Sequence, residues 1–264
     1  MNTINHFTLE SNNNIELNFD GGDLSSDSGL FLVNELINKL GFDEIIRSRF
    51  HTKDYAWFRL HSDYSNYMQV LFQIIAGYFA DDRADDLATE PVFLACLGKD
   101  RLASQPTLSR FFNRMEESTL QQQNEILQEM RSVVYSIPGN EPENILFDLD
   151  TTLLNTYGDQ EGSAWNHHYE ADGYHPKLCF DGNTGELLRI ELRNGTEYCS
   201  KDVAAFMQPL FDEYTSRYPS KKLFLRGEKA VVVDTSALLI RPDLLGELSE
   251  EYSCVFVPGF VIIA

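Results

Sequence analysis

The chain of 264 residues has little cysteine, little positive charge and no long hydrophobic run. No apolar stretch approaches the roughly 20 residues that cross a membrane, and the polar, Asn-rich N-terminus lacks the pattern of a signal peptide. The scattered cysteines have neither metal-ligand spacing nor the pattern of a disulfide framework. We therefore expect a reduced, cytoplasmic protein with no membrane partner. The cysteines are Cys96, Cys179, Cys199 and Cys254.

Positive charge is scarce, with 21 Lys and Arg against 41 Asp and Glu, which gives a net charge of -20. Affinity for a phosphate backbone comes mainly from Lys and Arg, so this balance argues against a general nucleic-acid binder. A local basic patch, or metal ions that neutralise the acids, would reconcile the charge with DNA binding. The hydrophobic content of 43% is enough for a folded core, and the length allows two domains.

Residues 1–25 look like a flexible or strand-like lead-in, and helical spacing dominates the rest of residues 1–140, which we expect to form an all-helical N-terminal region. One helix is predicted within residues 28–50, with Gly41 as its C-cap. Others are predicted over residues 64–80, from Pro91, from Pro106 and over residues 120–134. The helices beginning at Pro91 and Pro106 form either a helix-turn-helix or an ordinary packed pair. Turn residues at 138–142 then mark a boundary.

Strands and helices alternate after residue 144, so the fold class is α+β overall, with an α/β domain over residues 144–264. Strands are predicted over residues 145–153, 174–180, 186–192, 222–226 and 254–257, and helices over residues 201–218 and 242–251. The turn between the second and third strands is Asp181-Gly182-Asn183-Thr184-Gly185.

The acidic first strand carries the main chemical signal. In Leu146-Phe147-Asp148-Leu149-Asp150-Thr151-Thr152, apolar and acidic residues alternate, which places both carboxylates on one face. Carboxylates beside a core need compensation, and a divalent cation is the usual one. If the first and fourth strands are sheet neighbours, Asp150 faces the segment after Arg226. Asp150 and Glu228 there can bind Mg²⁺ or Mn²⁺ and support phosphoryl transfer.

Other interpretations compete with this one. Asp150 can also cap a turn with the threonines that follow it, and Glu228 can be a solvated turn residue. His167, His168 and His175 cluster with acidic residues, but their spacing is not that of a zinc site. No serine or cysteine has the motif of a nucleophile elbow.

Three blocks of the chain together resemble bacterial insertion-sequence transposases of the DDE type. The first runs from His61 to Tyr78 and on to Leu87, and the second is Ser104-Gln105-Pro106-Thr107-Leu108-Ser109-Arg110-Phe111. The third runs from the acidic strand through Tyr174-His175-Pro176 to Leu192-Arg193-Asn194-Gly195. The order and spacing of the blocks are more specific than any one of them.

This resemblance implies a ribonuclease-H-like catalytic core in which a metal-bound acidic triad cleaves and joins DNA at terminal inverted repeats. Asp150 matches the first triad aspartate. Glu228 occupies the slot of the second, with Asp234 as the alternative if the strand is redrawn through residues 231–233. The third acid, a glutamate, is expected further downstream. We therefore expect an inactive, C-terminally truncated copy with an incomplete core.

The resemblance also implies that the N-terminal region binds DNA, with a second copy of the chain as a further partner. We assign the DNA contacts to the second block and the arginine that follows it. An alternative is a non-catalytic DNA-binding remnant that inhibits a related transposase. The assigned residues are Ser104, Gln105, Thr107, Ser109, Arg110 and Arg114.

Overall fold

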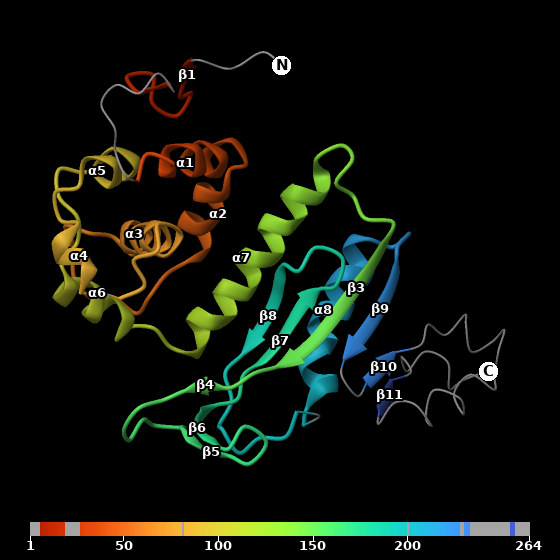
Figure 1. Ribbon diagram of the computed structural model, residues 1–264. Helices are drawn as coiled ribbons and strands as arrows, with labels where there is room; N and C mark the ends of the chain where they lie inside the picture. Colours follow the sequence, from red (N-terminus) through yellow and green to blue (C-terminus); the bar gives the residue numbers. More distant parts are fainter. Residues whose placement is uncertain are drawn as a thin grey trace. The chain divides into compact units, whose positions relative to one another are not determined.

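The computed structural model describes residues 6–18, 27–80, 82–199, 201–227, 230–232 and 254–256, and it combines helices with several sheets (Figure 1). The chain divides into two compact units, Met1–Val134 and Tyr135–Ala264. The division falls near the end of a long helix, a few residues before the turn at 138–142. The helix predicted over residues 242–251 lies outside the described residues.

The N-terminal unit is mainly helical. The first helix ends just before Gly41, as predicted, and a second helix follows within residues 28–50, because Gly41 adopts a left-handed conformation (φ 67°) between them. The helices are α1 (Leu30–Lys39), α2 (Phe42–Arg49), α3 (Asp63–Ile75), α4 (Arg83–Asp86), α5 (Pro91–Leu97), α6 (Gln105–Phe112) and α7 (Glu117–Ser136).

The expectation of an all-helical N-terminal region requires one correction. Strands β1 (His6–Thr8) and β2 (Glu16–Asn18) form an antiparallel hairpin, in which Phe7 is opposite Leu17. The hairpin is held to α1 by the buried carboxylate of Glu35. This carboxylate accepts hydrogen bonds from the backbone N–H groups of Glu10 and Ser11, both at 3.0 Å, and from the Ser11 hydroxyl at 2.6 Å.

Aromatic side chains fill the core of this unit. Phe50, Phe72, Phe93 and Phe111 are fully buried in one cluster and come from four different parts of the unit. The rings of Phe50 and Phe111 lie 5.9 Å apart between centroids. The buried area of such rings stabilises the unit, because aromatic side chains bury more apolar surface than most others.

The C-terminal unit is built on a mixed sheet with the order β11-β10-β9-β3-β7-β8 (Figure 1). In this sheet β3 is antiparallel to β7 and parallel to β9. The strands are β3 (Asn144–Thr151), β7 (Lys177–Asp181), β8 (Leu187–Glu191), β9 (Lys222–Gly227), β10 (Ala230–Val232) and β11 (Cys254–Phe256). A second sheet has the order β4-β6-β5, with β4 (Leu154–Asn155), β5 (Ala164–Asn166) and β6 (Ala171–Tyr174).

Helix α8 (Val203–Arg217) packs against one face of the larger sheet. Ile145, Phe147 and Leu149 point to this side and are buried, and the Phe147 ring lies edge-on to Tyr214, at 5.1 Å between centroids. Leu146, Asp148 and Asp150 alternate with them and therefore lie on the other face. The predicted strand with its carboxylates on one face is thus confirmed.

The turn after β7 has the form that its sequence predicts. The fully buried carboxylate of Asp181 accepts hydrogen bonds from the backbone N–H groups of Asn183 (2.7 Å) and Thr184 (3.2 Å) and from the hydroxyl of Tyr135 (2.7 Å). Gly185 closes the turn with a φ of 76°, a conformation that glycine adopts without strain.

Candidate functional site

Asp150 lies at the C-terminal end of β3 with its side chain exposed. Its Oδ1 atom accepts a hydrogen bond from the backbone N–H of Thr151 at 2.7 Å, which fixes the orientation of the carboxylate. Within the part of the chain that the structure describes, Asp150 forms no ion pair. This exposed carboxylate is therefore oriented by a backbone N–H and, among the described residues, by no ion-pair partner.

Asp148, two residues earlier on the same face, has a different environment. Arg226 of β9 donates two hydrogen bonds to it, from Nε to Oδ1 at 3.0 Å and from a terminal nitrogen to Oδ2 at 2.5 Å. The hydrogen bonds and charge of Asp148 raise the pKa of the Arg226 guanidinium. A carboxylate held in this bidentate geometry has its charge compensated by the protein itself.

The parallel pairing of β3 with β9 confirms that the first and fourth predicted strands are neighbours. Asp148 is opposite Arg226 and Leu149 is opposite Gly227 in the register. Glu228 and Asp234, the two candidates for the second acid, lie outside the described residues. Strand β10 ends two residues before Asp234 and runs antiparallel to β9.

A histidine and a cysteine that the sequence analysis left without a role lie beside this end of β3. The Thr151 hydroxyl donates a hydrogen bond to Cys199 Sγ at 3.2 Å, and His175 Nε2 lies 3.9 Å from the same sulfur atom. His175 is buried, and its Nδ1 atom is 2.7 Å from the carbonyl oxygen of Glu197. These contacts join residues 22 or more positions apart, so no local spacing in the sequence indicates them.

The motif Leu192-Arg193-Asn194-Gly195 has a structural role in the same region. Arg193 donates hydrogen bonds to the carbonyl oxygens of His175 (3.1 Å) and Tyr198 (2.9 Å). A Cβ atom on Gly195 would lie 2.2 Å from the carbonyl oxygen of Ala164, so only glycine fits there. The side chain of Arg193 therefore holds the loop that carries Cys199 against the segment around His175.

The carboxylate of Asp150 is an oxygen donor and suits a hard divalent cation better than a soft one. Mg²⁺ prefers oxygen ligands and is held by one or two carboxylates together with water and substrate phosphates. Asp150 supplies one such carboxylate. Among the described residues, no group of three or more His, Cys, Asp or Glu side chains is arranged to hold a metal ion.

The residues assigned to DNA contact lie on and around α6. Ser104 precedes the helix, with its hydroxyl 3.1 Å from that of Thr107, and the Gln105 backbone N–H donates to Asp85 at 3.0 Å. Ser109 is half-buried and Arg110 is exposed. Of this set, Arg110 offers the most accessible positive charge.

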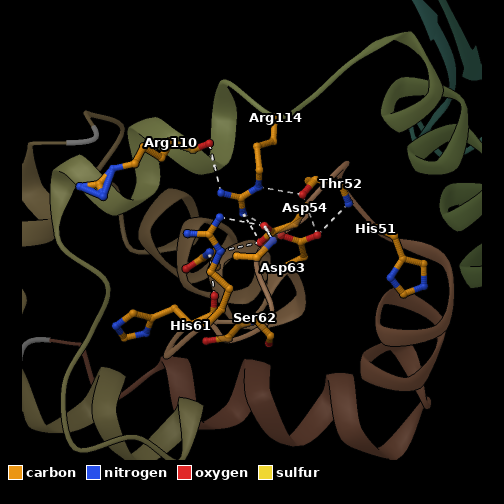
Figure 2. Close-up of polar contacts among 12 residues, drawn as sticks. His51, Thr52, Asp54, His61, Ser62, Asp63, Arg110 and Arg114 are labelled. Atoms are coloured by element: carbon orange, nitrogen blue, oxygen red, sulfur yellow. Dashed lines mark hydrogen bonds and ion pairs between the residues drawn. The ribbon is translucent and has the colours of Figure 1, made fainter.

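Arg114 is instead committed to contacts within the unit (Figure 2). Its guanidinium donates hydrogen bonds to Asp63 at 2.9 Å, to the Thr52 hydroxyl at 3.0 Å and to the carbonyl oxygen of Arg110 at 3.3 Å. Asp54 lies 3.8 Å away. The side chain of Arg110 extends away from this network in Figure 2. The two predicted DNA-contacting arginines therefore have different environments.

Comparison with protein families identifies the family of the chain. Residues 7–236 match the family described as "Transposase DDE domain group 1". The chain belongs to this family. It therefore carries a DDE transposase domain, a type of domain that generally uses divalent metal ions. A search of curated proteins gave no significant match.

One similar solved structure is the "Cryo-EM structure of piggyBac transposase synaptic complex with hairpin DNA (SNHP)", with 15% sequence identity and a TM-score of 0.29. The alignment covers 89% of this chain and 50% of that chain, so this transposase spans about half the length of the piggyBac chain. The likeness is too distant to carry an argument. Within the described ranges, no helix is long and apolar enough to span a membrane.

Proposed function

We propose that this transposase cleaves and joins DNA strands at the terminal inverted repeats of a bacterial insertion sequence, through a metal-dependent ribonuclease-H-like core. One observation carries the proposal. Asp150, the match to the first triad aspartate, stands exposed at the end of β3, and β9 runs parallel beside it with Gly227 opposite Leu149. In the sequence, Glu228 follows Gly227 directly, which supports it as the second acid of the proposal.

Asp150 would hold Mg²⁺ or Mn²⁺ together with Glu228 or Asp234. The metal would polarise the attacking oxygen and neutralise charge on the phosphate. The Thr151 N–H keeps the Asp150 carboxylate in one orientation, and Arg226 neutralises Asp148, which would otherwise add a second negative charge to this face. Glu228 is one methylene longer than the aspartate of the family motif, and cleavage geometry tolerates such displacements poorly. We therefore expect these 264 residues alone to bind metal weakly and not to complete strand transfer.

The experiment begins with the DNA on either side of the gene, where inverted repeats would define the substrate. Duplexes that carry those ends are then incubated with the purified chain and Mn²⁺, and retardation, nicking and joining are measured. Titration calorimetry with Mn²⁺ compares the parent chain with Asp150→Asn, and Glu228→Asp tests the second acid. Asp148→Asn is the matched control on the same strand face.

Weak Mn²⁺ binding that Asp150→Asn abolishes and Asp148→Asn preserves would support the assignment. Efficient joining of ends by the parent chain would refute the expected inactivity. Equal Mn²⁺ binding by parent and Asp150→Asn would remove Asp150 from the metal site. Retardation of end-containing DNA without any metal binding would favour the alternative of a DNA-binding inhibitor.

A further inference from the structure

Residues 53–60 form a closed loop between α2 and α3, which we call the aromatic loop. The carboxylate of Asp54 accepts two hydrogen bonds from Arg59, at 2.7 and 2.8 Å, and one from the backbone N–H of Ala56 at 3.0 Å. These contacts, with those from Arg59 foremost, hold the pKa of Asp54 well below its ordinary value. The two ends of the loop are thereby fixed to one another.

The base of the loop is fixed as well (Figure 2). The Asp63 carboxylate accepts hydrogen bonds from the backbone N–H and the hydroxyl of Thr52, at 2.7 and 2.8 Å, and from Arg114. Lys53 forms an ion pair with Glu116. The loop is therefore a defined structure held by charged groups from α3 and from the segment between α6 and α7.

Four large apolar side chains project from this loop into solvent. The exposed fractions are 93% for Tyr55, 103% for Trp57, 82% for Phe58 and 76% for Leu60. Large apolar side chains are usually buried on folding, and a contiguous group of them on a fixed loop marks an interaction site. Because the loop is already ordered, it loses little conformational entropy when a partner binds.

Two segments that meet at the loop carry several Lys and Arg residues. Residues 45–63 and 91–115 together carry eight Lys or Arg and three Asp, within a chain whose net charge is -20. The two segments are joined by the Arg114–Asp63 ion pair and by a contact of 2.9 Å between Lys99 Nζ and His61 Nδ1. Arg110 is exposed on α6 in the same area. Lys53, Arg59 and Arg114 are already paired with acids. The remaining cations, with Arg110 exposed among them, favour a partner with negative charge.

We propose that the aromatic loop stacks on unpaired DNA bases, while the surrounding cations bind the adjacent phosphates. The inference rests on the proposed function, since DNA is the partner proposed there, and it adds the element that grips melted or single-stranded DNA. A nucleic acid offers both features that this surface requires, a flat apolar ring and a negative charge beside it. Bases within a duplex already stack on each other, so open ring faces are found where the strands are unpaired.

Tryptophan fluorescence offers a direct test, because Trp57 and Trp165 are the two tryptophans of the chain. In a Trp165→Phe background, emission reports on Trp57 alone. Acrylamide quenching is measured before and after addition of a 20-nucleotide oligothymidylate, or of a blunt duplex of the same length. We expect the single strand to protect Trp57 from the quencher, and the duplex to protect it less.

The affinity for oligothymidylate is then measured for two variants. Trp57→Ala should bind about tenfold more weakly, because stacking on one base contributes roughly 1–3 kcal/mol. Phe79→Ala removes an aromatic ring that is 81% exposed in the same unit but outside the loop, and it should bind like the parent. Both side chains are exposed, so neither change should unfold the protein.

The outcomes separate this inference from the proposed function. If the parent binds DNA and Trp57→Ala binds it equally well, the role of the loop is refuted and the DNA partner stands. If the parent binds no DNA of any kind, the proposed DNA partner fails and the inference fails with it. Protection of Trp57 in the absence of DNA, by another part of the chain or by a second copy, would overturn the inference. Protection by the duplex but not by the single strand would overturn it too.

Discussion

Asp54 and Asp63 at the aromatic loop and Asp150 at the end of β3 are three carboxylates of one chain in contrasting environments. The first two are largely buried and accept hydrogen bonds from arginine, hydroxyl and backbone donors. Asp150 is exposed and, among the described residues, forms no ion pair. Carboxylates that are paired with arginine stabilise the fold, whereas an unpaired and exposed carboxylate remains available to a ligand.

Removal of Asp63 should have the largest effect on stability. Asp63→Ala leaves Arg114 and the Thr52 N–H without their acceptor at a site where both ionic side chains are only 15% exposed. Loss of one partner of such a pair should lower the free energy of unfolding by about 2–4 kcal/mol. Asp150→Ala, the matched change at an exposed position, should lower it by less than about 0.5 kcal/mol. Urea unfolding of both variants measures the difference, and equal losses would contradict the comparison.

Glu35 is a further carboxylate that stabilises the fold, and its role should appear in the pH dependence of stability. Burial would raise its pKa, but the hydrogen bonds from Ser11 and Glu10 and the charge of Lys39 lower it below the ordinary value of 4.5. A group with a lowered folded-state pKa contributes stability above its unfolded pKa and loses it as the pH falls through the folded value. Stability should therefore decline below about pH 4.5.

Glu35→Gln should remove that part of the decline and cost about 1–2 kcal/mol at pH 7. Urea unfolding of parent and variant between pH 3 and pH 7 measures both effects. Glu10→Gln, which keeps the backbone donor to Glu35, provides the control. A Glu35→Gln profile parallel to that of the parent at all pH values would show that this carboxylate does not couple folding to protonation.

The residues that sequence analysis could predict are those whose signals are local. Alternation of apolar and acidic residues predicts β3 and the shared face of Asp148 and Asp150, because side chains alternate along any strand. Gly41 predicts a helix end, since glycine adopts left-handed backbone angles at low cost. The pairing of β3 with β9 was only a condition of the metal-site hypothesis, and the structure shows it.

The remaining contacts depend on chain segments that meet only after folding. Arg114 looks like a free DNA-binding arginine in the sequence, and its partner Asp63 is 51 positions away. His175 and Cys199 come together through a loop held by Arg193. The short strands of the N-terminal hairpin carry too little periodicity to predict a pairing. The hairpin also depends on Glu35, which belongs to a different element.

The smallest expected effect concerns Asp148, the paired acid on the same strand face as Asp150. Arg226→Gln removes its partner at the exposed edge of the β3–β9 pair, where ion pairs add little to stability. The melting temperature should therefore change by less than about 2 °C. The freed Asp148 would add a negative charge two residues from Asp150, on the same face.

That added charge should raise the affinity for Mn²⁺ by about threefold at low salt, because exposed charges at this separation attract a divalent cation weakly. The gain should diminish in 0.5 M salt, and Asp148→Asn combined with Arg226→Gln should abolish it. Calorimetric titration of the three proteins at two salt concentrations measures this. An unchanged or lowered affinity in Arg226→Gln would mean that Asp148 is too far from the ion, or that Arg226 itself supports the site. The proposed division between a paired and an available carboxylate on β3 would then have to be abandoned.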